Sequence, residues 1–152
     1  GTNVITVHAI VRDSFSFSDT TPSTTDLDVE DMDLHYATLN SDEGSRQFTF
    51  QSYDMSDTAV KYLLGYTESE EGNWFEAPAV RPVQNFAIQV LTRKLDDIPA
   101  TCLQWARCKV EITKSGTLGK SGLPNFTFTC TEVVNLNAQG AAVPNHRFKF
   151  VE

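Results

Sequence analysis

Residues 102–116 read CLQWARCKVEITKSG and residues 126–136 read FTFTCTEVVNL, and these two segments decide the fold class. In the second, Phe126, Phe128 and Cys130 alternate with threonines, which is the period-two pattern of a strand with one buried face. The first is rich in aromatic and β-branched residues, as strands are. The glycine-rich connection between them, SGTLGKSGLPN, predicts a long hairpin or a flexible arm.

Most of the remaining chain also has strand character. Alternation or β-branched content predicts strands in the segments NVITVHAIV (3–11), SFSFS (14–18), RQFTFQSYD (46–54), NFAIQVLTR (85–93) and HRFKFVE (146–152), the last with Phe148 and Phe150 on one face. Turn or loop chemistry separates them at DTTPSTT (19–25), SDEGS (41–45), TESEEGNW (67–74) and NAQGA (137–141).

One segment, DMSDTAVKYLLGY, departs from the strand pattern. Ser56 suits an N-cap and Gly65 suits the position after the last helical residue. Between them Ala59, Val60 and Leu63 fall at helical spacing. We expect one short α-helix over about residues 56–64, and so short a helix must pack on a sheet.

These elements predict a single domain, residues 1–152, that is mainly β: an antiparallel sandwich or barrel with one short flanking α-helix. The apolar fraction of 40% and charged fraction of 21% are ordinary for a globular protein. No apolar run approaches the roughly 18 residues that span a membrane, so no membrane partner is expected. The chain opens on Gly1 rather than Met, which leaves open a removed targeting segment.

No motif points to a reaction. Cys102, Cys108 and Cys130 follow no zinc-site spacing and are expected to be buried structural thiols, although whether any of them pair stays open. The glycines at 116, 119 and 122 do not have Walker A spacing, and no G-x-S-x-G nucleophile elbow is present. We therefore expect a protein that is not an enzyme, with no catalytic residues, no metal and no cofactor.

The segment DLDVEDMDL, residues 26–34, carries five carboxylates in nine residues. Counted from Asp26, it lacks the glycine and the glutamate that an EF-hand loop needs at its sixth and twelfth positions. A calcium site of another kind, on β structure, stays open. The apolar residues alternate with a slip by one at Glu30–Asp31, which indicates a β-bulge or a strand end. The segment therefore predicts a short edge strand or an ordered arm.

Charge is distributed unevenly along the chain. Residues 1–76 hold 15 acidic and three basic residues, a balance of −12, whereas residues 77–152 hold five acidic and nine basic residues, a balance of +4. An acidic half and a basic half suit self-association, acidic face to basic face. The net charge of −8 has the wrong sign for a protein that grips DNA.

The aromatic pair Trp74 and Phe75 lies in a polar loop. Such a pair can form a platform for sugar rings, and the chain would then be a β-sandwich module that binds carbohydrate or a host surface, in a tail fibre, a baseplate or a secreted protein. Alternatively, one of the two aromatic residues anchors the loop to the core.

Three blocks of the sequence together resemble the phage major tail (tail tube) protein family. They are VRDSFSFSDTTPSTTDLDVEDMD (11–33), GSRQFTFQSYDMSDTAVKYLLG (44–65) and ARCKVEITKSGTLGKSGLPNFTFTCTEV (106–133). The resemblance lies in the order and rhythm of the elements over most of the chain, and it includes no catalytic signature.

The resemblance implies a structural protein of the virion tail, assembled in the cytoplasm of a bacterial host. Its copies would form rings, usually of six, that stack into a hollow tube and meet other tail proteins. Double-stranded DNA would pass through the tube without specific binding, because an acidic lumen lowers phosphate affinity.

On this hypothesis, acidic and basic segments of neighbouring copies meet. The expected contact residues are Asp26, Asp28, Glu30, Asp31 and Asp33 on one copy and Lys114 and Lys120 on the next. Surface ion pairs contribute about 0–1 kcal/mol each, so these contacts would set register more than strength.

Overall fold

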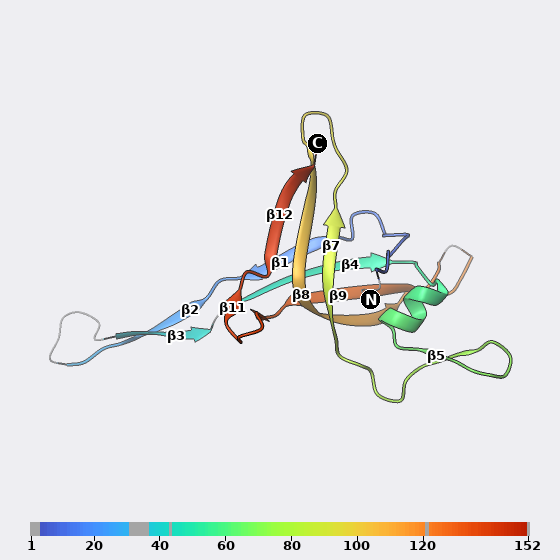
Figure 1. Ribbon diagram of the computed structural model, residues 1–152, viewed down its shortest axis with the longest axis horizontal. Helices are drawn as coiled ribbons and strands as arrows, with labels where there is room; N and C mark the ends of the chain where they lie inside the picture. The colour runs from blue at the N-terminus through green and yellow to red at the C-terminus, as the bar shows by residue number, and fades with distance from the viewer. Residues whose placement is uncertain (1–3, 31–36, 43, 121, 152) are drawn as a thin grey trace.

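A computed structural model describes residues 4–30, 37–42, 44–120 and 122–151 and shows a mainly β, antiparallel protein, as the sequence predicts (Figure 1). One curled six-stranded sheet has the order β1-β4-β9-β8-β12, with β7 also paired to β8. Its strands are β1 (Ser16–Thr20), β4 (Ser45–Ser52), β7 (Gln84–Leu91), β8 (Ala100–Ser115), β9 (Asn125–Glu132) and β12 (His146–Val151).

Three two-stranded ribbons complete the described fold. They are formed by β2 (Ser23–Leu27) with β3 (Ala37–Asp42), β5 (Thr67–Glu68) with β6 (Phe75–Glu76), and β10 (Asn135–Leu136) with β11 (Ala142–Val143). Figure 1 shows that the β2–β3 ribbon projects from one end of the sheet and the β5–β6 ribbon from the other. We call the β2–β3 ribbon with its turn residues, 21–44, the arm.

Strand β8 organises the sheet because it pairs with three others. One edge pairs with β7, and the other pairs with two strands in succession: β12 along Ala100–Trp105 and β9 along Cys108–Ser115. In Figure 1, β12 rises steeply while β4 lies nearly horizontal, so the sheet turns strongly along β8. Strand β12 therefore lies on the same edge of β8 as β9 and diverges from it.

The core is small and largely aromatic. Phe48 and Phe50 on β4, Trp105 on β8 and Phe128 on β9 are buried, and their rings contact one another at centroid distances of 4.4 Å (Phe48 to Trp105) and 4.6 Å (Phe50 to Phe128). Phe15, just before β1, stacks on the two β4 phenylalanines. The alternation of Phe and Thr in β4 and β9 therefore has the expected cause, which is one face against this cluster.

A short helical segment flanks the sheet where the sequence predicts it, as a π-helix, η1, over Ala59–Leu63. The Ser56 Oγ accepts a hydrogen bond from the backbone N–H of Ala59 at 3.3 Å, and Gly65 follows the last turn with φ +70°. The Leu64 N–H donates to the Ala59 carbonyl, five residues back, so the turn is wider than an α-helix. Ala59 and Val60 are buried, as a helix packed on a sheet requires.

The strand expected over residues 3–11 is absent from the described residues 4–11, and that prediction is wrong. Ala9 has φ +52°, a left-handed conformation that interrupts an extended chain. An isolated bridge joins Ile10 to Ser52, the Val11 N–H donates to the Gln51 carbonyl, and the Ser52 hydroxyl and the Tyr53 N–H donate to the carbonyls of His8 and Ala9. The β-branched residues of this segment are compatible with a strand, but no partner strand pairs along its length.

The predicted loop at 19–25 is wrong in part, because Asp19 and Thr20 belong to β1 and Ser23–Thr25 belong to β2. The β2–β3 pairing has a register shift between Ser23 and Thr24. The slip predicted at Glu30–Asp31 lies beside the end of the described arm, since Glu30 is in a turn and Asp31 is outside the described residues. Of the acidic segment, Asp26 and Leu27 lie in β2, and residues 31–34 lie outside the described residues, so the prediction of an edge strand or ordered arm over the whole segment stays a prediction.

Two glycines are required by the backbone. Gly72 and Asn73 both have positive φ, +78° and +56°, in the second half of the turn, residues 70–73, that joins β5 to β6. At Gly44 a Cβ atom would lie 2.4 Å from the Thr20 carbonyl oxygen, where the arm leaves the β1–β4 ribbon. No other residue fits there without moving the backbone.

The buried thiols give the first prediction. Burial raises the pKa of Cys108 to about 11, with the Glu132 carboxylate adding to the effect, and burial raises the pKa of Cys130 to about 12, with Cys108 adding to it. The unfolded chain loses these protons near pH 9 while the folded chain keeps them, so stability falls as pH rises from about 9 to 11. We expect urea midpoints to fall over this range, and to fall less steeply in the double variant Cys108→Ala/Cys130→Ala.

Equal slopes in the two proteins would contradict this explanation. All three cysteines are free and buried, so a thiol reagent at pH 8 should label the folded protein slowly and the urea-unfolded protein at three sites.

Candidate assembly surfaces

The molecule exposes far more surface than a compact monomer of its mass. Its accessible surface is 11956 Å², whereas the area expected for a folded monomer of 16.9 kDa is about 7,700 Å². The excess is roughly 4,300 Å². Among the described residues, only eleven apolar side chains and Ser52 are buried.

The arm carries three of the predicted contact residues. Asp26, Asp28 and Glu30 are exposed, and the Asp26 carboxylate accepts a hydrogen bond from the Thr38 hydroxyl at 2.8 Å across the ribbon. Asp31 and Asp33, also predicted contact residues, lie outside the described residues. The register places Leu27 opposite Ala37 and Thr25 opposite Leu39, so the two leucines share the face opposite Asp26.

The predicted basic partners do not lie near the arm of the same copy. Lys114 is an exposed residue near the end of β8, and Lys120 is an exposed residue of the connection between β8 and β9. This connection lies at the opposite end of the molecule from the arm in Figure 1. Any meeting of these charges therefore requires two copies, as the hypothesis states.

The loop aromatics divide into one half-buried ring and one exposed ring. Phe75 is half-buried in β6, and the Lys61 ammonium lies 5.6 Å from the centre of its ring while pairing with Glu68 at 2.5 Å. The hydrogen bond to Glu68 raises the pKa of Lys61. Trp74 is 72% exposed at the end of the same hairpin. Phe75 is thus the less exposed of the two rings and contacts Lys61, whereas anchoring of the loop to the core and the role of Trp74 stay predictions.

Strand β12 presents an amphipathic surface that sequence reasoning did not identify as a site. Phe148 and Phe150 are 60% and 65% exposed, and their rings contact edge to face at 6.0 Å. Arg147 and Lys149 lie on the opposite face, where the Arg147 Nε donates to the Gln104 side chain at 2.8 Å. The alternating order Arg-Phe-Lys-Phe is the signal in the sequence, and it predicts a strand with the two phenylalanines on one face, without saying what covers that face.

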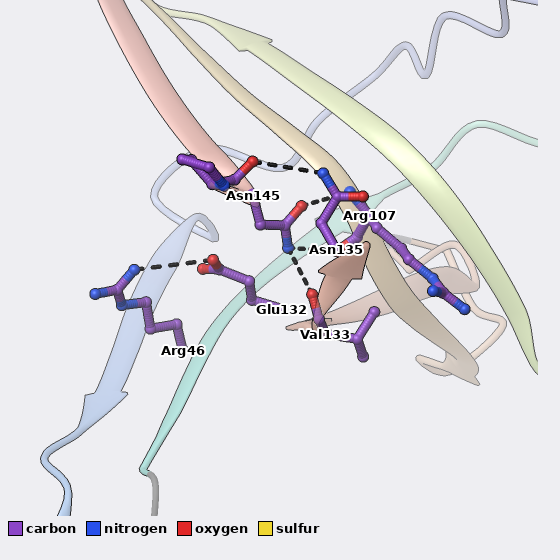
Figure 2. Close-up of polar contacts among 7 residues, drawn as sticks. Arg46, Arg107, Glu132, Val133, Asn135 and Asn145 are labelled. Carbon is purple, nitrogen blue, oxygen red and sulfur yellow. Dashed lines mark hydrogen bonds and ion pairs between the residues drawn. The ribbon is translucent and has the colours of Figure 1, made fainter. Parts of the chain in front are cut away.

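We call the place where β9 and β12 separate along β8 the fork. A polar cluster that the sequence did not predict lies there (Figure 2). The Asn145 side chain accepts from the Arg107 N–H at 2.6 Å and donates to the carbonyls of Arg107 and Val133 at 2.7 and 2.9 Å. The Asn145 carbonyl accepts from the Ala106 N–H at 2.9 Å. This one side chain therefore satisfies backbone groups that neither neighbouring strand reaches.

Next to the fork, Glu132 forms an ion pair with Arg46 at 3.8 Å, and the His146 ring packs on Trp105 at 4.7 Å. The Glu132 Oε2 and the His146 Nδ1 are buried and make no hydrogen bond within the described part of the chain. Both residues line a hollow of about 70 Å³, room for about two water molecules. A hollow of this volume is too small to hold a substrate.

Other sites for chemistry are sparse in the described residues. No group of three or more His, Cys, Asp or Glu side chains in this part of the chain is placed to hold a metal ion. The described helical structure includes no segment long and apolar enough to cross a membrane. A second hollow, of about 280 Å³, lies on the basic face of β12, and Gln104, Arg147 and Lys149 are among the residues that line it.

The fork gives the second prediction. Asn145→Ala leaves the N–H and carbonyl of Arg107 and the carbonyl of Val133 without this side-chain partner, so we expect a loss of about 1–3 kcal/mol in the free energy of unfolding. Asn135→Ala is the matched control, because the Asn135 side chain makes one long hydrogen bond, 3.4 Å to the Pro144 carbonyl. Urea unfolding of both variants measures the difference, and equal losses would show that the fork does not depend on Asn145.

The described surfaces thus suit contact with another macromolecule better than they suit catalysis on a small molecule. The arm, the exposed Trp74 and the amphipathic β12 are the three surfaces with the clearest binding chemistry. No protein-family model, curated protein or solved structure matched this chain.

Proposed function

We propose that this chain is a structural subunit of a phage or phage-derived tail tube, whose copies assemble into stacked rings around a conduit for DNA. The observation that carries the proposal is the surface excess of roughly 4,300 Å² of the whole 152-residue chain over a compact monomer of the same mass. A standard protein interface takes about 800 Å² from each partner, so this excess is enough for contacts with more than one neighbour.

The shape of the chain supports self-assembly in particular. An isolated two-stranded ribbon is marginally stable in water, yet the arm projects from the sheet with two exposed leucines on one face. Leu27 and Leu39 are 41% and 52% exposed. If the arm lay on a neighbouring copy, these two leucines would be covered. The resemblance of the chain to tail tube proteins suggests that the assembly is a tube of stacked rings.

The charge of the chain suits a conduit rather than a DNA-binding protein. With a net charge of −8, the protein as a whole repels phosphate. A tube of such subunits would let DNA slide without sticking, and its subunits would meet one another and the other tail proteins at the ring faces. The proposed role is mechanical, with no reaction and no cofactor.

A shortened arm gives the third prediction. Thr20 and Ser45 are directly paired across β1 and β4, so residues 21–44 can be replaced by Asn-Gly, which closes the ribbon with a two-residue turn. The small aromatic core lies outside the arm, so this variant should fold as a monomer. We expect rings or tubes of the full chain by negative-stain microscopy and sedimentation at rising concentration, and none of the shortened chain.

Seeding with preformed assemblies is included because a subunit can stay monomeric until nucleated. The proposal fails if the full chain, seeded and at high concentration, sediments as a monomer indistinguishable from the shortened variant. Thiol protection and circular dichroism of the shortened variant check that it is folded.

One observation favours a second candidate, a module that binds carbohydrate or a host surface. Trp74 is 72% exposed beside the half-buried Phe75, as a sugar-stacking residue would be. We expect Trp74→Ala to abolish any binding on a glycan array while Tyr62→Ala, which removes another exposed aromatic, leaves it unchanged. Absence of binding by the unmodified protein would remove this candidate.

A further inference from the structure

We propose that strand β2 in the arm of one copy pairs with the free edge of strand β12 in the next copy, so that the curled sheet continues from subunit to subunit. This inference rests on the proposed self-assembly and specifies its contact. It differs from the contact expected from the sequence, because it replaces Lys114 and Lys120 by Arg147 and Lys149 as the basic partners of the arm.

The edge of β12 is available for pairing. Within the described residues, β12 pairs only with β8 and ends the strand order of the sheet, so its other edge presents unpaired backbone groups. Charged residues such as Lys149 on an edge discourage indiscriminate pairing. The same charges admit a strand of opposite charge, so the edge selects its partner.

The two faces of β12 have different chemistry. The exposed rings of Phe148 and Phe150 lie on one face, beside Leu103 of β8 in the register. Arg147 and Lys149 lie on the other face. There they line the hollow of about 280 Å³, which is open to the surface beside the edge and has room for acidic side chains.

Strand β2 has the matching arrangement. Leu27 lies on one face with Leu39 of β3, and Asp26 lies on the other, with Asp28 following at the same parity. One edge of β2 pairs with β3, and its other edge pairs with no strand of the described chain.

When β2 lies beside β12, both faces match at once. Leu27 falls on the side of Phe148 and Phe150, and the carboxylates of Asp26 and Asp28 fall on the side of Arg147 and Lys149. Because side chains alternate strictly along a strand, a shift of one residue would place the acids on the phenylalanines and the leucine on the basic residues. The pairing therefore sets its own register.

The edge near Lys114 offers no such match. Beyond Val110, the edge of β8 that faces β7 is free, but its polar face there carries Glu111, Thr113 and Ser115. Glu111 is a carboxylate, already paired with Lys109 at 2.8 Å, and it would repel an acidic strand. Lys114 lies on the opposite face, with Val110 and Ile112.

The contact joins two different surfaces of one chain, so it is head to tail. Contacts of this kind generate a closed ring or an open helical filament, depending on the rotation between copies. A ring-forming subunit needs such a contact, and each copy would use its arm on one side and its β12 edge on the other.

Charge reversal gives the fourth prediction. Arg147→Glu/Lys149→Glu should raise the protein concentration needed for ring formation about tenfold or more, because two attractive pairs become repulsive. Asp26→Lys/Asp28→Lys should do the same, and the variant that combines all four changes should assemble near the concentration of the unmodified chain. Lys114→Glu/Lys120→Glu is the matched control, with the same change in net charge, and should assemble normally.

Cysteine cross-linking tests the pairing directly and does not depend on recovery of assembly in the variant that combines all four charge changes. A chain with Asp26→Cys is mixed with a chain with Lys149→Cys and oxidised, and we expect a disulfide-linked dimer from the mixture. Replacing the second chain by Lys120→Cys should give none. The three native thiols are buried and should not compete.

The outcomes separate this inference from the proposed function. If the unmodified chain forms rings but the β12 reversal assembles normally, or if cross-linking follows Lys120 instead of Lys149, the pairing is overturned and the tube proposal stands. If the unmodified chain never assembles, both the pairing and the tube proposal are contradicted. Loss of assembly in the two reversed variants, recovery in the combined variant and a cross-link through Lys149 together support the pairing.

Discussion

The fold depends on one constraint: strand β8 must satisfy the hydrogen bonds of three other strands. Along one edge it is paired first with β12 and then with β9, and between these two the only backbone partner of Arg107 in the described residues is the Val133 N–H, 3.4 Å from the Arg107 carbonyl. The Asn145 side chain supplies the other partners (Figure 2). This arrangement lets β9 and β12 diverge, so one sheet has both a packed part around Trp105 and an outlying part that ends in β12.

The sequence predicted the local elements better than their arrangement. The Phe–Thr alternation in β4 and β9 and the Ser56 and Gly65 signals of the short helix are local patterns, and each appears as expected. The loop predicted at 67–74 is a turn only at 70–73, because Thr67 and Glu68 form β5. The strand predicted at 3–11 failed because β-branched residues describe a preference for extended backbone, whereas a strand also needs a partner. A left-handed Ala9 could not be read from its residue type.

The candidate surfaces could also be predicted only in part, because a local pattern does not show which partner a residue meets. The start of the acidic segment, Asp26 and Leu27, lies in β2, in line with the strand that its alternation predicts, whereas Asp31 and Asp33 lie outside the described residues. The exposure of Phe148 and Phe150 could not be predicted, because the alternation of β12 is the same whether its apolar face is covered by the chain itself or by a neighbour. The role of Asn145 lies in a long-range meeting of residues 107, 133 and 145, for which no local pattern exists.

A small core combined with a large exposed area links folding to assembly. A subunit that gains its remaining buried surface from neighbours has a stability that depends on its own concentration. The proposed tube would then be more stable than the subunits that form it.

Gly44 has a consequence of a different kind. Because any side chain there would collide with the Thr20 carbonyl, the angle between the arm and the sheet is set by a residue with no side chain. In a chain of identical subunits joined through their arms, a change of that angle would be repeated at every joint. A deviation of a few degrees, negligible in one molecule, would accumulate around the circle and decide whether it closes.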